Sequence, residues 1–354
     1  MQASRSSQRG LTIVELMIGL LLGVLLLGGV LQIYLSSSQT YRSTEGLSRV
    51  QESGRFAIDF LTTDLRQAGY KGSCSRDTEV KNHLNEAGVG YSAELFELGD
   101  GIRGWNSGNG GYALTGYRAG TDSVLVKHAA ALAGVTASGN TPANANTINL
   151  TAASGVSDGQ IVLVSDSEGC DVFQNRNNAN ANSLTRGASN NNPGPGNKSP
   201  ASSDFSHAYG EGMDIHLVRS AVYYVGTGAS GLPALRRLTF DAGSAGVNEE
   251  LVDGIVDLQI CYGVDTSQDG DADNYAAADA VGDWNEVVAA RVSVVAISPT
   301  GGTATESPTV QFADCDGAVL IRTQVNYPEL LDAQGRPRLA QVFTSTIGLR
   351  NRLP

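Results

Sequence analysis

The stretch that decides the fold lies at residues 11–35 and reads LTIVELMIGLLLGVLLLGGVLQIYL. At ~1.5 Å of rise per residue, roughly 25 helical residues reach about 37 Å, which exceeds the ~30 Å hydrocarbon core of a bilayer. The run contains one charged residue, Glu15. The sequence therefore predicts a membrane-spanning helix over residues 11–35.

The ten residues before this run, MQASRSSQRG, carry Arg5 and Arg9 and no acidic side chain. By the positive-inside rule this leader stays in the cytoplasm, and the chain after the helix lies on the outer side of the membrane. A secretory signal peptide has its small-residue cleavage site after the apolar core, whereas here Gly10 precedes the core. The order of these features argues against an ordinary secretory signal.

A carboxylate in the middle of a membrane helix costs about 2.5 to 3.5 kcal/mol on insertion scales, so Glu15 calls for a partner. Residues 9–26 resemble the type IV prepilin signature, in which a dedicated peptidase cuts after the glycine. The resemblance implies cleavage between Gly10 and Leu11, N-methylation at Leu11, and pairing of Glu15 with the N-terminal amine of a neighbouring subunit. The family usually has Phe where this chain has Leu11. The alternative is an uncleaved signal anchor whose Glu15 reaches the membrane interface.

The helical pattern continues past the membrane. Apolar residues recur at three- and four-residue spacing between Leu47 and Ala68, with charged residues between them, and Gly69 and Gly72 follow. We therefore expect one long helix over residues 11–68 that packs its apolar stripe on a sheet of the same chain.

The remainder, residues 69–354, is rich in turn signals: the whole chain has 43 glycines and 6% aromatic residues. Short apolar runs at 123–127, 160–165, 221–225, 251–261 and 287–297 predict an antiparallel sheet. Residues 175–203 are mostly Asn, Ser, Gly, Ala and Pro, and they predict a flexible surface loop. The expected fold class is α+β, a long N-terminal helix on a β-rich head.

Four cysteines, Cys74, Cys170, Cys261 and Cys315, are widely spaced and form no CxxC pair. In an exported chain this pattern predicts two disulfides. Of the three pairings, we favour Cys74 with Cys170 and Cys261 with Cys315, because each bridge then stays within one half of the chain.

The densest polar cluster places oxygen-bearing side chains at positions 1, 3 and 5 of a loop and a glycine at position 6, as an EF-hand loop begins. Ala276 stands where the EF-hand has its bidentate Glu. Two interpretations remain open, a calcium site and a solvated acidic hairpin turn. The candidate calcium ligands are Asp265, Ser267, Asp269, Asp271 and Asp273.

The sequence does not predict an enzyme. Its four histidines are dispersed, and it contains neither an HExxH zinc motif nor a GxSxG nucleophile elbow. GTGASG at residues 226–231 is spelled like a dinucleotide loop, but a second strand follows it, so a hairpin turn explains it better. The net charge of -12 argues against nucleic acid as a partner.

The head resembles the PilW-like branch of the minor pilins in three segments, GCDVFQ at 169–174, AVYYVGTG at 221–228 and LQICYGVDTSQDGDADNY at 258–275. This resemblance implies the ladle shape of pilins and a minor pilin that primes or caps a type IV pilus after cleavage. It places the chain in the inner membrane with a periplasmic head, and then in the pilus. The implied partners are other minor pilins, the major pilin, the inner-membrane assembly platform, a tip adhesin and the prepilin peptidase.

Two alternatives remain. A minor pseudopilin of a type II secretion system has the same N-terminal signature. An anchored periplasmic protein that binds or hydrolyses a small molecule would use the helix only as an anchor.

Overall fold

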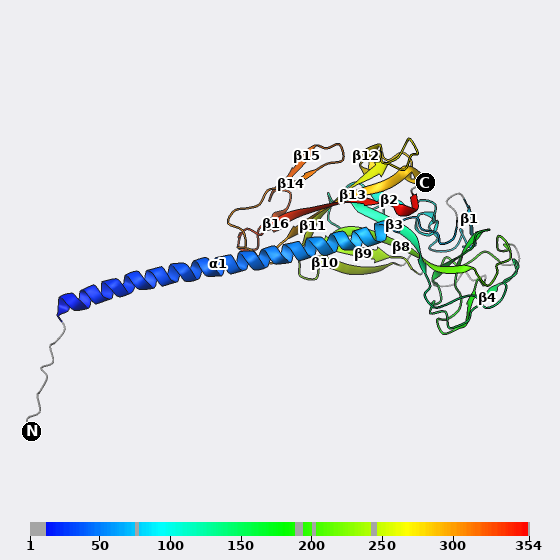
Figure 1. Ribbon diagram of the computed structural model, residues 1–354, viewed down its shortest axis with the longest axis horizontal. Coiled ribbons are helices and arrows are strands. Elements are labelled where there is room, and N and C mark those ends of the chain that lie inside the picture. Colours follow the sequence, from blue (N-terminus) through cyan, green and yellow to red (C-terminus); the bar gives the residue numbers. More distant parts are fainter. Residues whose placement is uncertain (1–11, 75–77, 188–193, 200–202, 242–245, 353–354) are drawn as a thin grey trace, which may run out of the picture.

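The computed structural model describes residues 12–74, 78–187, 194–199, 203–241 and 246–352. The predicted leader, residues 1–10, and the predicted cleavage site at Gly10 and Leu11 lie outside the described residues. The longest element is helix α1, Ile13–Leu65, whose first half projects far from a β-rich head (Figure 1). The molecule thus combines one long N-terminal helix with a head built mainly of strands.

Helix α1 begins and ends at sites that its sequence explains. Thr12 is the N-cap, and its hydroxyl accepts a hydrogen bond from the Glu15 backbone N–H. The helix ends at Leu65, three residues before the predicted end at 68. Gly69 and Gly72 then take positive φ angles of 75° and 65°, which allow the chain to turn back toward the sheet.

Eight strands form the larger sheet, in the order β1-β6-β5-β8-β3-β2 with β9 and β10 added at β8. Strand β8 is the centre of this sheet, because different parts of its 14 residues pair with β5, β3 and β9. The strands are β1 (Val80–Asn82), β2 (Ile102–Trp105), β3 (Ser123–Ala131), β5 (Ile161–Ser165), β6 (Cys170–Gln174), β8 (Asp214–Thr227), β9 (Pro233–Thr239) and β10 (Val247–Asp253).

A four-stranded antiparallel sheet has the order β12-β11-β13-β16, and two small sheets pair β14 with β15 and β4 with β7. The strands of the four-stranded sheet are β11 (Ile255–Val264), β12 (Asn274–Ala276), β13 (Val287–Ile297) and β16 (Ala340–Gly348). The others are β4 (Thr147–Asn149), β7 (Ser183–Thr185), β14 (Val310–Ala313) and β15 (Val319–Arg322). Short helices are α2 (Ala93–Phe96), η2 (Ala278–Ala280), η3 (Trp284–Glu286), η4 (Pro328–Leu330) and η5 (Arg350–Arg352).

The second half of α1 completes the main hydrophobic core. Val50, Leu61 and Leu65 are buried at helical spacing against strands β11 and β13 and their neighbours. Fully burying each of these side chains contributes about 1.5 to 3 kcal/mol. The helix approaches the sheet closely at Gly54, where an added Cβ would lie 2.1 Å from the Phe343 ring of β16. The predicted packing of the apolar stripe on a sheet of the same chain is present here.

The buried carboxylate of Asp122 joins the two large sheets. It accepts hydrogen bonds from the backbone N–H groups of Ser107 and Ile260, at 2.9 and 2.8 Å, and Ile260 belongs to β11. Burial raises the pKa of Asp122 to about 7, against the lowering effect of these two hydrogen bonds. The sheets are therefore tied by a polar contact as well as by apolar packing.

The expected strand positions agree with the structure except where a glycine breaks a run, but the strands lie in more than one sheet, and β1 pairs with β6 in parallel. Strand β13 has the expected bounds of residues 287–297. The expected strand at 251–261 instead contributes to both β10 and β11, because Gly254 between them has a φ of 76°. A single strand would need an extended backbone at that position.

The expectation of an unpacked loop at 175–203 is wrong for the residues that the structure describes there. This segment contains strand β7, and Asn175, Leu184, Arg186 and Asn197 are all buried. Composition misled the prediction because the asparagines replace apolar packing with hydrogen bonds. The side-chain amide of Asn175, for example, donates to the carbonyls of residues 156, 157 and 177.

Candidate functional site

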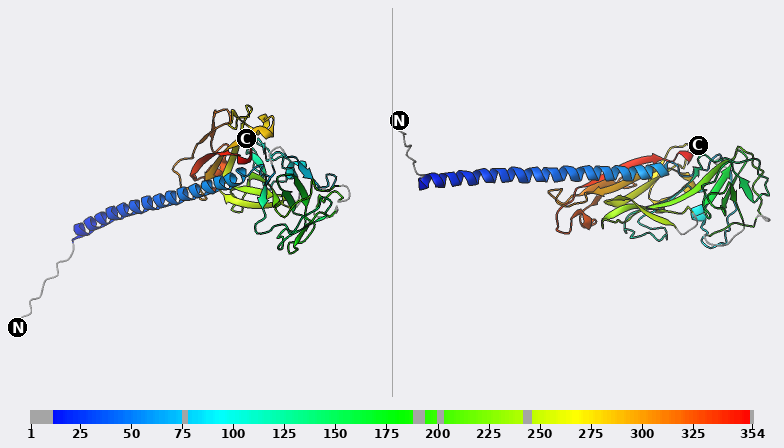
Figure 2. Two further views of the ribbon diagram at one scale, coloured as in Figure 1. Left: turned by 45° about the vertical axis from the view of Figure 1, so that its right-hand side comes forward. Right: turned by 90° about the horizontal axis from the view of Figure 1, so that it is seen from below.

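The first half of α1, residues 13–35, is an apolar rod on which no other described part of the chain packs. Among the described residues, α1 is the one helix long and apolar enough to cross a membrane, and none of its most apolar 18-residue window is buried. Figure 2 shows this half of the helix extending away from the head. Its large side chains between Ile13 and Leu35 are exposed throughout. Such a surface is stable only in lipid or against other protein, so this half of the helix is the first part of the candidate site.

Glu15 sits at the start of this rod. Its carboxylate accepts hydrogen bonds from the backbone N–H and the hydroxyl of Thr12, both at 3.2 Å, and Thr12 in turn caps the Glu15 N–H. This is a reciprocal capping box, which satisfies donors at the helix start. The carboxylate is exposed, so its remaining acceptor sites face outward and can receive a cation.

The second half of α1 also keeps an exposed face. Phe56 and Phe60 are four residues apart and remain 50% and 39% exposed, whereas Ala57 and Leu61 beside them are fully buried. Residues at i and i+4 share one side of a helix. The helix therefore buries one side against its own head and exposes two aromatic rings on another side.

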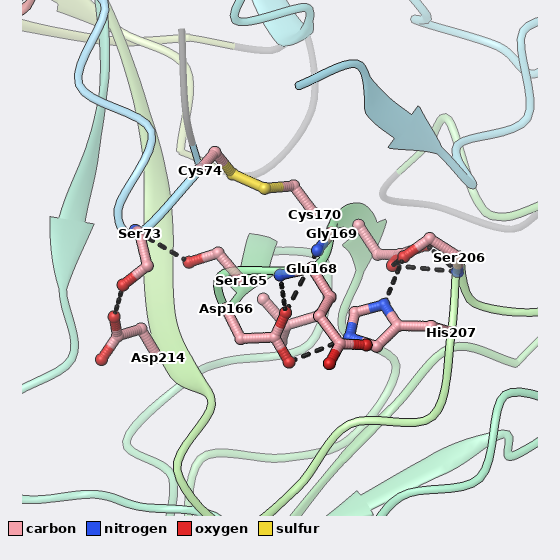
Figure 3. The surroundings of a disulfide bond; sticks show 12 residues. Ser73, Cys74, Ser165, Asp166, Glu168, Gly169, Cys170, Ser206, His207 and Asp214 are labelled. Atoms are coloured by element: carbon pink, nitrogen blue, oxygen red, sulfur yellow. Dashed lines mark hydrogen bonds and ion pairs between the residues drawn. A yellow bond between two sulfur atoms is a disulfide. The ribbon is translucent and has the colours of Figure 1, made fainter. Parts of the chain in front are cut away.

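The first disulfide joins Cys74, just after α1, to Cys170 at the start of β6 (Figure 3). Beside it, Asp166 accepts hydrogen bonds from the backbone N–H groups of Glu168 and Gly169 and lies 2.9 Å from the imidazole Nε2 of His207. Burial acts to raise the pKa of Asp166, but the hydrogen bonds of His207 and these amides lower it below its usual value. The bridge thus fastens the end of the helix to an ordered polar corner of the head.

A second polar cluster surrounds Asp171, one residue after the bridge. The imidazole Nε2 of His83 lies 2.5 Å from one Asp171 oxygen, and its Nδ1 lies 2.8 Å from the Ser203 hydroxyl. The hydroxyls of Ser206 and Tyr209 both donate to Asp171 at 2.5 Å. Burial acts to raise the pKa of Asp171, but the hydrogen bonds from His83, Ser206 and Tyr209 hold it below its usual value.

This cluster has the residue types of a hydrolase triad but the surroundings of a structural fastening. His83 is fully buried, and the Arg186 guanidinium lies 3.3 Å from the Nδ1 atom that faces Ser203. The cluster connects residues 203–209 to β6. The sequence does not reveal this cluster, because His83, Asp171 and Ser203 are far apart along the chain.

The second disulfide joins Cys261 of β11 to Cys315, which follows β14. Both bridges are the pairs that the sequence favours. Among the described residues, one group of three His, Cys, Asp or Glu side chains brings ligand atoms within 4.8 Å of each other, and it consists of these two cysteines and Asp314. Because both sulfurs are in the bridge, this group is not a metal site.

The structure places the acidic loop between β11 and β12, as a hairpin connection. The Asp265 carboxylate accepts hydrogen bonds from the backbone N–H groups of Gln268, Asp269 and Gly270. The Asp273 carboxylate accepts from the backbone N–H groups of Thr266 and Ser267. These amides use carboxylate oxygens that a calcium ion would need, and they explain the acidic turn without an ion.

The remaining candidate calcium ligands are placed differently. Asp269 accepts from the Asp271 N–H, and the Ser267 hydroxyl donates to Asp265 and Asp273. Calcium binding at this loop stays a prediction. The glycine-rich run at 226–231 covers the end of β8 and the turn that leads to β9, with the Gly228 N–H donating to the Leu232 carbonyl.

Comparison with known proteins supplies one match, and it lies in the head. Residues 222–351 match a protein family, from within β8 through β16 and into η5. That family is type IV pilus-assembly protein W. The match covers less than half of the chain, and it relates the chain to type IV pilus assembly. No curated protein and no solved structure matches the chain.

Proposed function

We propose that this chain is a minor pilin, a structural subunit that inserts α1 into a type IV pilus and helps to start or cap the fiber. The observation that carries the proposal is the joint presence of the exposed apolar rod and a head related to a pilus-assembly family. The apolar half of α1 lies at the N-terminal end of the chain. It can therefore move from the membrane into a bundle of similar helices without exposing apolar surface to water. A long apolar helix with a head built mainly of strands supports this proposal, because a pilin is expected to have a ladle outline.

In this proposal a peptidase cuts between Gly10 and Leu11 and frees an amine. Glu15 lies near the start of α1 with acceptor capacity left over after its bonds to Thr12. Pairing of this carboxylate with the N-terminal amine of a neighbouring subunit would neutralise both charges in a low-dielectric bundle. The partners are other pilins and the inner-membrane assembly machinery, and the head remains periplasmic until the fiber is extended.

The test is the intact mass and N-terminal sequence of the protein recovered from membranes and from sheared surface fibers. We expect a chain that begins at Leu11 with one added methyl group and that reaches fibers. A Glu15→Ala variant should remain in the membrane, while Glu45→Ala, farther along the same helix, should assemble as the wild type does. A retained leader, together with absence from fibers, would contradict the proposal.

A further inference from the structure

We propose that the outer edge of strand β16 is a docking site for an extended segment of another subunit, which adds to the four-stranded sheet as its next strand. The proposal rests on the proposed function in that the partner is sought in the same fiber. Strand β16 is the last strand of its sheet, and in the described parts of the chain no other strand pairs with its outer edge. Figure 1 shows β16 beside α1, with β14 and β15 on the side away from the helix.

The register of β16 decides which backbone groups face this edge. It pairs with β13 over all nine of its residues without a bulge. The Leu349 N–H donates to the Val288 carbonyl, and the Ser298 N–H donates to the Leu339 carbonyl. In an antiparallel ladder this fixes the odd-numbered residues of β16 as those bonded to β13.

The even-numbered residues therefore direct their N–H and C=O groups outward: Ala340, Val342, Thr344, Thr346 and Gly348. Within the described chain, none of these backbone groups has a hydrogen-bond partner beyond the sheet. Thr344, Thr346 and Gly348 are exposed, so the edge is open over its second half. An unpaired row of donors and acceptors at this spacing is the template for strand addition.

The edge also lacks the features that usually prevent such pairing. Protected edges are short, bulged, or interrupted by proline or charge. Strand β16 reads AQVFTSTIG, with no charged residue and no proline, in a chain of net charge -12. An uncharged edge fits an uncharged, β-branched or aromatic segment, because cross-strand pairs of these residue types stabilise a sheet.

The β16 edge of a second copy does not fit this edge. Strand β16 runs in the same direction as α1, since Gly46 lies beside Leu339, Gly54 beside Phe343, and Asn351 beside the helix end. Antiparallel pairing of two β16 edges about a two-fold axis would point the two membrane helices in opposite directions. Parallel pairing about a two-fold axis would place the outward-facing, even-numbered residues of the two strands at the same height. In a parallel ladder the bonding residues of the two strands are offset by one residue, so this arrangement cannot form the hydrogen bonds. This excludes the pairing of two β16 edges, and we assign the occupant to an extended segment of a different subunit.

The first arm of the test uses proline on the full chain in its native host. Thr346→Pro removes one outward N–H without breaking a bond to β13, and Thr346→Ala is its matched control. Gly348 offers a second pair, Gly348→Pro and Gly348→Ala, because a Cβ there meets nothing within 4 Å. We expect both proline variants to lower the amount of chain in sheared fibers by about fivefold or more, the effect of losing one hydrogen bond, and both alanine controls to assemble normally.

The second arm measures hydrogen exchange in the wild-type chain, in the detergent-solubilised subunit and in fibers. We expect the Thr344 and Thr346 amides to exchange about tenfold or more slowly in fibers, while Ser345 is protected in both states. A photo-crosslinker at position 346 should join this edge to consecutive residues of one extended segment.

Unchanged exchange at Thr344 and Thr346, or proline variants that assemble as the alanine controls do, would overturn the docking site. If either result is found but the chain still reaches fibers in a Glu15-dependent manner, the docking site is refuted and the proposed function stands. If the wild-type chain never reaches fibers, the proposed function and this inference fail together. A crosslink to another copy of this chain would refute the assignment to a different protein.

Discussion

Gly54 is the residue at which helix and sheet come closest. A Cβ at this position would lie 2.1 to 2.5 Å from three atoms of the Phe343 ring. We expect Gly54→Ala to push Phe343 out of its place and to lower the free energy of unfolding by about 1 to 3 kcal/mol. Urea unfolding of the solubilised full chain would measure this. Glu52→Ala, on the exposed side of the same turn, should change little, and equal stability of the two variants would contradict the close contact.

Asp171 is the residue that holds the polar cluster of the head together. In Asp171→Asn, an amide NH2 group replaces one carboxylate oxygen that accepts hydrogen bonds from the surrounding donors. We therefore expect the free energy of unfolding to fall by about 3 to 5 kcal/mol at pH 7. Because the folded pKa of Asp171 lies below its unfolded value, its contribution is present above the unfolded pKa and is lost as pH falls through the folded pKa.

The difference in the free energy of unfolding between wild type and Asp171→Asn should therefore shrink as the pH is lowered below about 4. Urea titrations of both proteins across this range would show it. The exposed Glu211→Gln variant serves as the control. A difference that stays constant with pH would mean that Asp171 acts through packing and not through its charge.

At the residue scale, the sequence predicts what depends on local order and misses what depends on the fold. Glu15 stands out because a charge interrupts an apolar run, and that signal needs no structure. Asp171 gives no such signal, since His83 and Tyr209 reach it only after β6 has formed. The acidic loop leaves two interpretations open in the sequence, and the structure adds that Asp265 accepts hydrogen bonds from the backbone of its own turn.

At the element scale, the bridge between Cys261 and Cys315 ties β11 to the hairpin of β14 and β15. Its ends are 54 residues apart in sequence, which corresponds to about 4 kcal/mol in the chain-entropy model. We expect the double variant Cys261→Ser, Cys315→Ser to lose stability of this order in urea unfolding. It should also release the hairpin to proteolysis before the rest of the head. Simultaneous cleavage throughout the head would contradict a local role.

Helix α1 consists of two halves with different requirements. Substituting Leu22→Arg and Leu26→Arg together places two charges in the predicted span, at about 2.5 to 3.5 kcal/mol each at mid-membrane. We expect the double variant to leave the carbonate-resistant membrane fraction, whereas Arg49→Lys, which lies in the head-packed half, stays in it. Retention of the double variant in that fraction would show that the rod is not the anchor.

Elements with strong periodicity are the ones that the sequence predicts well. Strand β13 and helix α1 are long and regular, so their patterns survive in any context. Strand β7 is three residues long, and it exists because β4 lies beside it. No local pattern announces such a strand, which is why residues 175–203 were expected to be unpacked.

At the scale of the whole molecule, the predicted membrane span and the two disulfides both predict that the head lies outside the cytoplasm. Both bridges join segments that are far apart in sequence, so the head must fold before its cysteines meet. The disulfides then form and persist in an oxidising environment. In the proposed topology, the positive leader and the predicted span direct the head there. The full chain should therefore carry no reactive thiol after alkylation under denaturing, non-reducing conditions.

A chain that begins at residue 36 lacks the leader and the span and should remain in the cytoplasm. Under the same alkylation it should gain four labels, one at each cysteine, as read from its intact mass. Adding a cleavable secretory signal to that chain is the matched control, and it should remove the four labels again. Labelled thiols in the full chain would place the head in the cytoplasm and would contradict export of the head, since reduced thiols are the expectation on that side of the membrane.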